Sequence, residues 1–145
     1  MSDVSAFPTI STRVRVHGNN ALTFKAAETI KAGMVVCIDN DGNIVAGDSD
    51  DGYMCIGVAD TDAATNESVT VNTAGTICYV ANEDDTTAIG EGTVLMVANA
   101  NIGGVVVAQA AGADADEYII GLALTDIAAD GWGLCLVNPA MSNTA

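Results

Sequence analysis

A ten-residue phrase that occurs twice constrains the fold of this chain more than any other feature. Residues 56–65 read IGVADTDAAT, and residues 120–129 read IGLALTDIAA. The segments around the two copies also match, so the chain contains two pseudo-repeats, at about residues 29–80 and 88–138. A single unit of this size could hardly bury its apolar face. We therefore expect the two units to pack together around one core.

The match between the two units extends beyond the phrase itself. Apolar and glycine positions recur in the same order, and the spacing drifts by about five residues between the ends, which indicates longer loops in the second unit. The aligned pairs are Ile30 with Ile89, Gly33 with Gly92, Val35 with Val94, Val36 with Leu95, Ile56 with Ile120, and Gly57 with Gly121.

Short apolar runs separated by turn residues predict an all-β chain. Val and Ile are abundant in these runs, as is typical of strands. Asp41-Gly42 lies between two runs and predicts a hairpin turn with positive φ. No segment has a long helical period, so we expect little helix beyond a short turn near residues 24–30. The predicted strands are 34–38, 43–46, 54–59, 68–72, 76–81, 93–98, 104–108, 118–124 and 132–137.

These patterns predict a compact barrel-like or sandwich-like β domain over residues 26–145, preceded by an extended N-terminal arm over residues 1–25. The segment TRVRVHG within the arm alternates polar and apolar residues, and it would form a strand if it found a sheet edge. Gly57 and Gly121 are expected to be structural corners. Each lies between apolar strand residues, where a Cβ would clash with a neighbouring backbone or the strand bends.

The charge is divided unevenly along the chain. The net charge is −15, and all four basic residues lie within the first 31 positions, whereas all but two of the 19 acidic residues come later. Such a body repels phosphate backbones, so we expect no nucleic-acid partner. No run approaches the roughly 18 apolar residues of a membrane span, and we expect no membrane partner and no secretion signal. The division favours a basic arm that docks onto something, carried by a solvated acidic body.

Neither the cysteines nor the lone histidine forms a recognisable catalytic or metal motif. The four cysteines lack C-x-x-C spacing and lie in apolar runs, so we expect buried reduced thiols, while a disulfide between strands, for instance Cys37 with Cys55, stays open. His17 has no nucleophile signature near it. The segment DNDGN has the spacing of a calcium loop, but Ile44 stands at its sixth position, which favours turn chemistry. We expect no catalytic residue, metal or cofactor.

Trp132 is flanked by glycines in DGWGLCLV. We expect it to anchor the core or a subunit interface rather than to stack on a ligand. The mean hydropathy of the chain is positive, +0.35, despite its charge. This suggests that some apolar surface is buried against another subunit or partner.

The order AxxIxxGxVVxxDxxGxVxxA followed by IGVAxxDAA resembles the head decoration (capsid cement) proteins of tailed bacteriophages. The resemblance covers most of the chain from about Ala26 onward and rests on turn and strand patterns without catalytic residues. The residues that carry it are Ile30, Gly33, Val35, Val36, Asp41, Gly42, Val45, Ala46, Ile56 to Ala59 and Asp62 to Ala64.

This resemblance implies a non-enzymatic structural protein of the virion, assembled in the host cytoplasm. It would bind the outer surface of an expanded capsid as a homotrimer and clamp neighbouring major capsid protein subunits against internal DNA pressure. In lambda-like examples an N-terminal arm orders on the shell and adds strand pairing to a capsid loop. The corresponding capsid-binding candidates are Phe7, Arg13, Arg15, His17 and Lys25.

Two other readings compete with the capsid role. A carbohydrate- or surface-binding β module of a virion fibre or tail accessory would expose a row of aromatic residues, whereas the aromatic residues here are few and scattered. The second alternative is a small enzyme or a swinging-arm carrier domain. A carrier would need a lysine at an exposed hairpin tip, but Lys25 and Lys31 both precede the first strand of the repeat.

Overall fold

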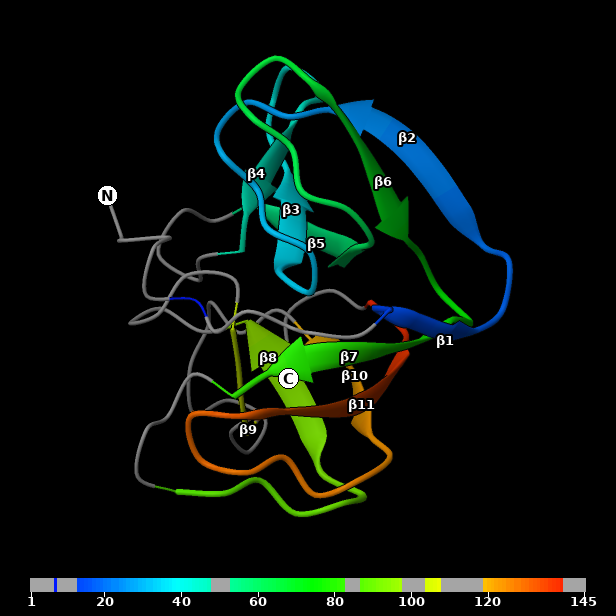
Figure 1. Cartoon of the computed structure of the whole chain (residues 1–145), viewed down its shortest axis with the longest axis vertical. Coiled ribbons are helices and arrows are strands. Elements are labelled where there is room, and N and C mark those ends of the chain that lie inside the picture. The colour runs from blue at the N-terminus through cyan, green and yellow to red at the C-terminus, as the bar shows by residue number, and fades with distance from the viewer. Residues whose placement is uncertain are drawn as a thin grey trace.

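The computed structural model describes residues 7, 13–47, 53–82, 87–97, 104–107 and 119–139. These residues form two antiparallel sheets packed as a β-sandwich (Figure 1). The six-stranded sheet has the order β1 (Arg15–His17), β7 (Ile77–Ala81), β11 (Trp132–Val137), β10 (Ile119–Ala123), β8 (Val94–Val97), β9 (Val105–Val107). The five-stranded sheet has the order β2 (Ala21–Lys25), β6 (Ser68–Asn72), β5 (Met54–Ala59), β3 (Val35–Ile38), β4 (Ile44–Ala46).

The all-β prediction is confirmed, and each of the nine predicted strands is present within a residue of its expected ends. The hairpin at Asp41-Gly42 joins β3 to β4, and Gly42 has a φ of +82°. The segment TRVRVHG contributes β1, which lies at the edge of the six-stranded sheet as expected. Residues 98, 108 and 118, at the ends of three predicted strands, lie outside the described residues.

The short helical turn expected near residues 24–30 is wrong. Residues 21–25 form β2, which pairs with β6 over its whole length, from Ala21 opposite Asn72 to Lys25 opposite Ser68. The described residues contain no helix, and none of them therefore forms a helix capable of crossing a membrane. The physical reason is tertiary: β6 offers an open edge, and pairing with it satisfies the β2 backbone groups that a helix would have satisfied internally.

The two sheets repeat one topology. Within the five-stranded sheet the order is β2-β6-β5-β3-β4, and within the other sheet it is β7-β11-β10-β8-β9, with β1 added beside β7. The structural units therefore run from β2 to β6 and from β7 to β11. Each begins with a strand that the sequence match did not place there, because β2 (ALTFK) and β7 (ICYVA) share almost no sequence.

Equivalent hydrogen bonds hold the loops of both units. Gly33 N–H donates to the Ala59 carbonyl at 2.8 Å, and Gly92 N–H donates to the Ala123 carbonyl at 2.7 Å. The carboxylates of the doubled phrase act in the same way. Asp62 Oδ1 accepts the Ala32 N–H at 2.7 Å, and Asp126 Oδ1 accepts the Glu91 N–H at 2.9 Å. The repeated TD pair therefore ties each corner to the loop before β3 or β8.

Two apolar clusters fill the interior. The first lies between the sheets and joins one face of each. The second covers the other face of the five-stranded sheet, where residues such as Ile30, Met34 and Ala63 close over Val36 and Val71. All four cysteines are buried free thiols in the first cluster. Burial raises the pKa of Cys78 to about 11 and that of Cys135 to about 12, so these thiols act as small apolar side chains.

The residues assigned to the N-terminal arm divide into two groups. Residues 15–17 and 21–25 are strands of the two sheets, so this part of the segment is built into the sandwich. Residues 1–6 and 8–12 lie outside the described residues. The boundary between arm and β domain at residue 25 stays a prediction. In the structure, β1 and β2 come before this boundary and are strands of the sandwich.

Candidate functional site

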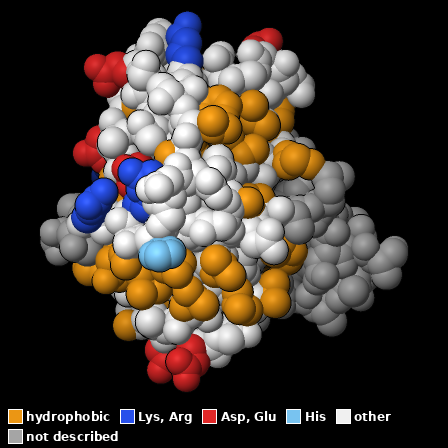
Figure 2. Space-filling model, turned by 90° about the vertical axis from the view of Figure 1, so that its right-hand side faces the viewer, with side chains coloured by type: hydrophobic (Ala, Val, Ile, Leu, Met, Phe, Trp, Pro, Cys, Tyr) orange, Lys and Arg blue, Asp and Glu red, His pale blue; other side chains and the backbone are white. Residues whose placement is uncertain are grey.

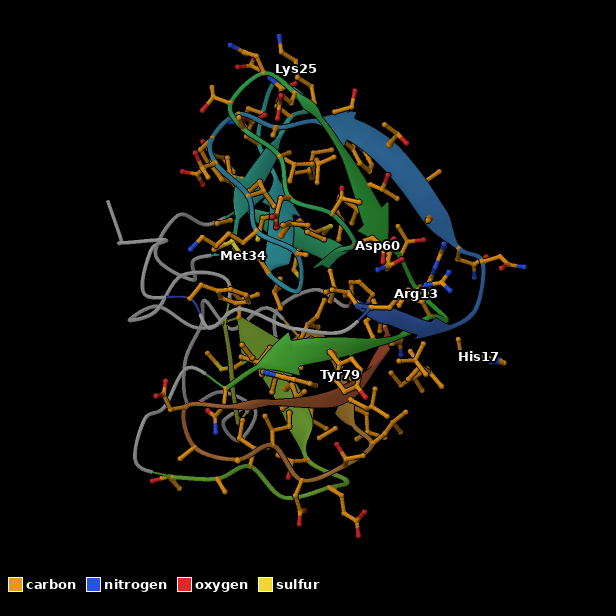
Figure 3. The ribbon with its side chains drawn as sticks, in the orientation of Figure 1. Arg13, His17, Lys25, Met34, Asp60 and Tyr79 are labelled. Atoms are coloured by element: carbon orange, nitrogen blue, oxygen red, sulfur yellow. The ribbon has the colours of Figure 1, made fainter. Side chains whose placement is uncertain are left out.

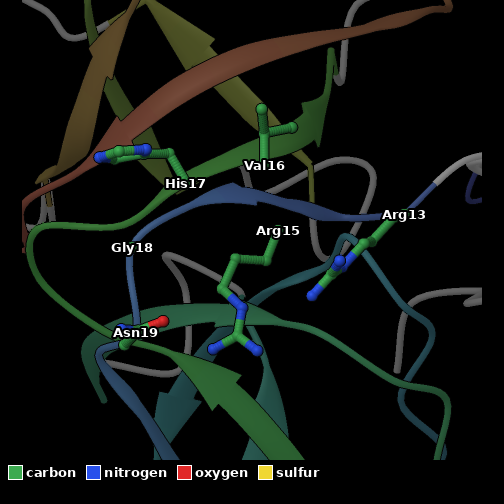
Figure 4. A pocket seen from close by; sticks show the side chains of 6 residues that line it. All are labelled: Arg13, Arg15, Val16, His17, Gly18 and Asn19. Atoms are coloured by element: carbon green, nitrogen blue, oxygen red, sulfur yellow. The ribbon is translucent and has the colours of Figure 1, made fainter.

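Three of the predicted binding residues lie together on or beside β1. Arg13, Arg15 and His17, with neighbouring Val16, Gly18 and Asn19, line a hollow of about 420 Å³ (Figure 4). In that view Arg13 and Arg15 extend to one side of β1, and Val16 and His17 extend to the other. Two of the chain's four Lys and Arg side chains therefore meet at one sheet edge, beside its single histidine.

The sequence holds this edge on a fixed support. Val14 is only 3% exposed, and its carbonyl accepts the Tyr79 N–H at 3.0 Å. Gly18 has a φ of +96°, and a Cβ there would lie 3.2 Å from the Thr76 Cα. Asn20 Nδ2 donates to the Ala74 carbonyl at 2.9 Å. The connection from β1 to β2 is thus pinned to the turn between β6 and β7, which positions the arginines.

β1 and β2 are both edge strands on the same side of the molecule (Figure 1). Among the described residues, β1 pairs only with β7 and β2 pairs only with β6, so each has one edge without a strand partner. An open edge presents backbone donors and acceptors to another chain. We give the name basic edge to the region that comprises Arg13, β1, β2 and the connection between these two strands.

Charges of both signs lie near β1, on the side toward the five-stranded sheet (Figure 3). The pKa of Cys78 is raised chiefly by burial, while the Asp60 carboxylate raises it further and the Arg15 guanidinium lowers it. Asp60 Oδ1 also accepts a hydrogen bond of 3.2 Å from Asn72 Nδ2. Figure 3 shows Arg13 and Asp60 near the boundary between the two sheets, on the side of the basic edge.

The remaining two arm candidates do not line the hollow. Lys25 is exposed at the far end of β2, away from the hollow (Figure 3). Phe7 is 6% exposed and belongs to the cluster that covers the five-stranded sheet. Its ring is therefore a core side chain in this structure, and we do not include it among the surface residues of the site.

The two predicted corner glycines lie inside the sheets. A Cβ on Gly57 would overlap the Asn72 carbonyl oxygen, and a Cβ on Gly121 would overlap the Leu136 carbonyl oxygen. In both units, therefore, the backbone of the neighbouring strand lies equally close to the glycine. Neither glycine lines the hollow at β1.

Trp132 lies at the start of β11 and contacts Tyr79 edge to face, with 4.7 Å between the ring centroids and an interplanar angle of 84°. Both rings are half-buried. A sugar-stacking platform would need exposed ring faces in a row, and this pair does not provide one.

Metal ligation has no support in the described part of the chain, which contains no group of three or more His, Cys, Asp or Glu placed to hold an ion. In the segment with calcium-loop spacing, Asp39 Oδ1 accepts the N–H groups of Asp41 and Asn43, each at 2.9 Å. The turn uses this carboxylate for its own backbone, as expected from turn chemistry.

Sequence reasoning missed the apolar outer face of the six-stranded sheet. Leu122, Leu134 and Leu136 lie there half-buried, and Val94 is 46% exposed. The available signal was WGLCLV, whose residues are apolar on both faces of the strand. Such a run is typical of a strand covered on both sides.

The fold and the basic edge together define a class: an all-β module whose open strands and clustered cations are suited to binding another protein. A comparison with known protein families identifies one that fits this class. The family model for phage cement proteins matches residues 15–138, and the chain belongs to the phage cement protein family. It is therefore a structural protein of the phage virion that binds the capsid.

A solved structure shares the fold. The chain resembles the N base of the head fiber protein gp8.5 of bacteriophage phi29, with a TM-score of 0.57 and 16% sequence identity, over 81% of this chain and 92% of that one. A comparison with curated protein sequences gives no match.

Proposed function

We propose that this cement protein binds the outer surface of an expanded capsid as a homotrimer, with its basic edge against the major capsid protein, and stabilises the shell against internal DNA pressure. The observation that carries the proposal is that Arg13, Arg15 and His17 line one hollow at an open sheet edge, in a chain with a net charge of −15. Most of the charged residues outside this edge are acidic, which suits a surface that faces water.

Docking combines two interactions. A segment of the capsid protein adds to the open backbone edge of β1 or β2, and the arginines pair with carboxylates or carbonyl groups beside that segment. Leu22 on β2 is 57% exposed and Val16 on β1 is 53% exposed, so both strands also offer apolar contacts. The charged part of this interaction weakens as salt rises.

Stabilisation follows from mass action. A protein that binds the assembled lattice but not the separated subunits shifts the equilibrium toward the lattice by its binding free energy. A trimer presents three basic edges, so that each edge that binds raises the effective concentration of the others. Neighbouring capsid subunits are then held together through one cement particle.

The proposal is tested by co-sedimentation with expanded capsids of the same phage. The variant Arg13→Gln/Arg15→Gln removes both arginine charges and keeps β1 intact, which a deletion of residues 2–20 would not. We expect binding to fall by about tenfold or more per arginine, with a weaker dependence on salt. Lys31→Gln removes one charge from the loop after β2 and serves as the control, with binding expected at the wild-type level.

Undiminished binding of the double arginine variant would contradict docking through the basic edge. Binding by neither the wild-type protein nor the variants would contradict the capsid role as a whole.

A further inference from the structure

The pseudo-repeat assigns a partner to the apolar outer face of the six-stranded sheet. In the first unit, Val35 and Val58 point away from that unit's own loops and are completely buried, because the second unit packs on them. Their equivalents in the second unit are Val94 and Leu122. Val94 is 46% exposed and Leu122 is half-buried, since nothing in the described part of the chain covers them.

This outer face is continuous across four strands. Cross-strand pairing places Val94 opposite Leu122, Leu122 opposite Leu136, and Leu136 opposite Ile77. Tyr79 and Leu134 form the next pair along, and Trp132 packs against Tyr79. We call Ile77, Tyr79, Val94, Leu122, Trp132, Leu134 and Leu136 the sheet face. Figure 2 shows hydrophobic side chains gathered in a band beside His17, over the lower part of the molecule.

The sheet face is more apolar than the equivalent face that the chain itself covers. By strand pairing, Leu134 and Leu136 stand where the first unit has Thr70 and Asn72. The face carries no charged residue, although the chain has 19 acidic residues. A hollow of about 330 Å³ also opens on it, between Val94, Leu122 and Leu136. A large uncharged apolar surface of this kind is typical of a protein interface.

We infer that the sheet face is the self-association surface of this protein, where three copies meet around a common axis; the inference rests on the trimer of the proposed function. The occupant is a second copy because the equivalent face of the first unit is already covered by a sheet of this same chain. Two acidic bodies repel one another over most of their surface, and the sheet face is where they approach without bringing like charges together.

The test is the solution mass, measured by light scattering on the full chain. The wild-type protein should have three times the mass of the 14.6 kDa chain. Val94→Asp and Leu122→Asp place a charge on the sheet face and should each weaken association by roughly 100-fold, giving monomers at micromolar concentration. Met54→Asp is the matched control, because Met54 is 42% exposed on the five-stranded sheet. It should remain a trimer.

Folding of each variant is checked by circular dichroism, and a second measurement needs no variant. Acrylamide should quench Trp132 fluorescence more strongly when dilution dissociates the wild-type trimer. Trimeric Val94→Asp and Leu122→Asp proteins, or a wild-type protein that is monomeric, would overturn the inference. Unchanged quenching on dissociation would also overturn it.

Salt distinguishes this inference from the docking proposal. Higher salt screens repulsion between the acidic bodies and should strengthen self-association, whereas it should weaken capsid binding through the arginines. A trimer that fails to bind capsids contradicts the proposed function and leaves the sheet face supported. A capsid-bound protein with an undisturbed trimer in both Asp variants contradicts the sheet face alone.

Discussion

Gly121→Ala adds one methyl group at a position where the structure has no room for it. The new Cβ would overlap the Leu136 carbonyl oxygen and lie 3.0 Å from the Cys135 sulfur. A side chain can move aside at a cost of about 1–3 kcal/mol, but a backbone carbonyl cannot move without separating two strands. Loss of one or two ladder hydrogen bonds adds about 1 kcal/mol each. We expect the free energy of unfolding to fall by about 2–5 kcal/mol.

The assay is urea unfolding followed by Trp132 fluorescence, at one protomer concentration so that association does not shift the midpoint. A loss of this size lowers the melting temperature by about 6–15 °C, at roughly 3 °C per kcal/mol for a chain of this length. Gly90→Ala is the control, because a Cβ there meets only the Thr93 hydroxyl, at 4.0 Å. Gly57→Ala should match Gly121→Ala. The reasoning is refuted if Gly121→Ala unfolds within about 0.5 kcal/mol of Gly90→Ala.

Two further predictions concern the corners and the thiols. Asp62→Ala and Asp126→Ala each remove a hydrogen bond to a loop N–H, and urea unfolding should show similar losses of about 1 kcal/mol; clearly unequal losses would contradict the equivalence of the corners. Burial raises the pKa of Cys78 to about 11 and of Cys135 to about 12, above the ordinary value of about 8.5. The unfolded chain therefore loses these protons first as pH rises. Stability should be fully present below about pH 8.5 and fall above it by up to about 1.4 kcal/mol per pH unit per thiol. Cys78→Ala should reduce that slope in urea titrations at several pH values, and an unchanged slope would contradict the assignment.

Much of the fold could be predicted because the signals are local. Runs such as SVTVN and TICYV have strand composition, and Asp41-Gly42 has the turn chemistry of a hairpin. The doubled phrase predicted two units, and the close strand contacts at Gly57 and Gly121 show why the same small residue stands in both.

The parts that could not be predicted depend on long-range packing. β2 has three exposed residues of five and weak apolar alternation, so only its pairing with β6 shows that it is a strand. Phe7 looked like an arm residue, because nothing local indicates that its ring reaches the core. Val35 and Val94 occupy equivalent positions, yet only the stacking of the two sheets decides which of them is covered.

The most direct test of the account is a cryo-electron microscopy map of the expanded capsid decorated with this protein. The account predicts three copies at each site, with β1 and β2 against the major capsid protein and an added strand or side-chain contacts at Arg13 and Arg15. A map in which the basic edge faces solvent, with the acidic surface against the shell, would contradict it.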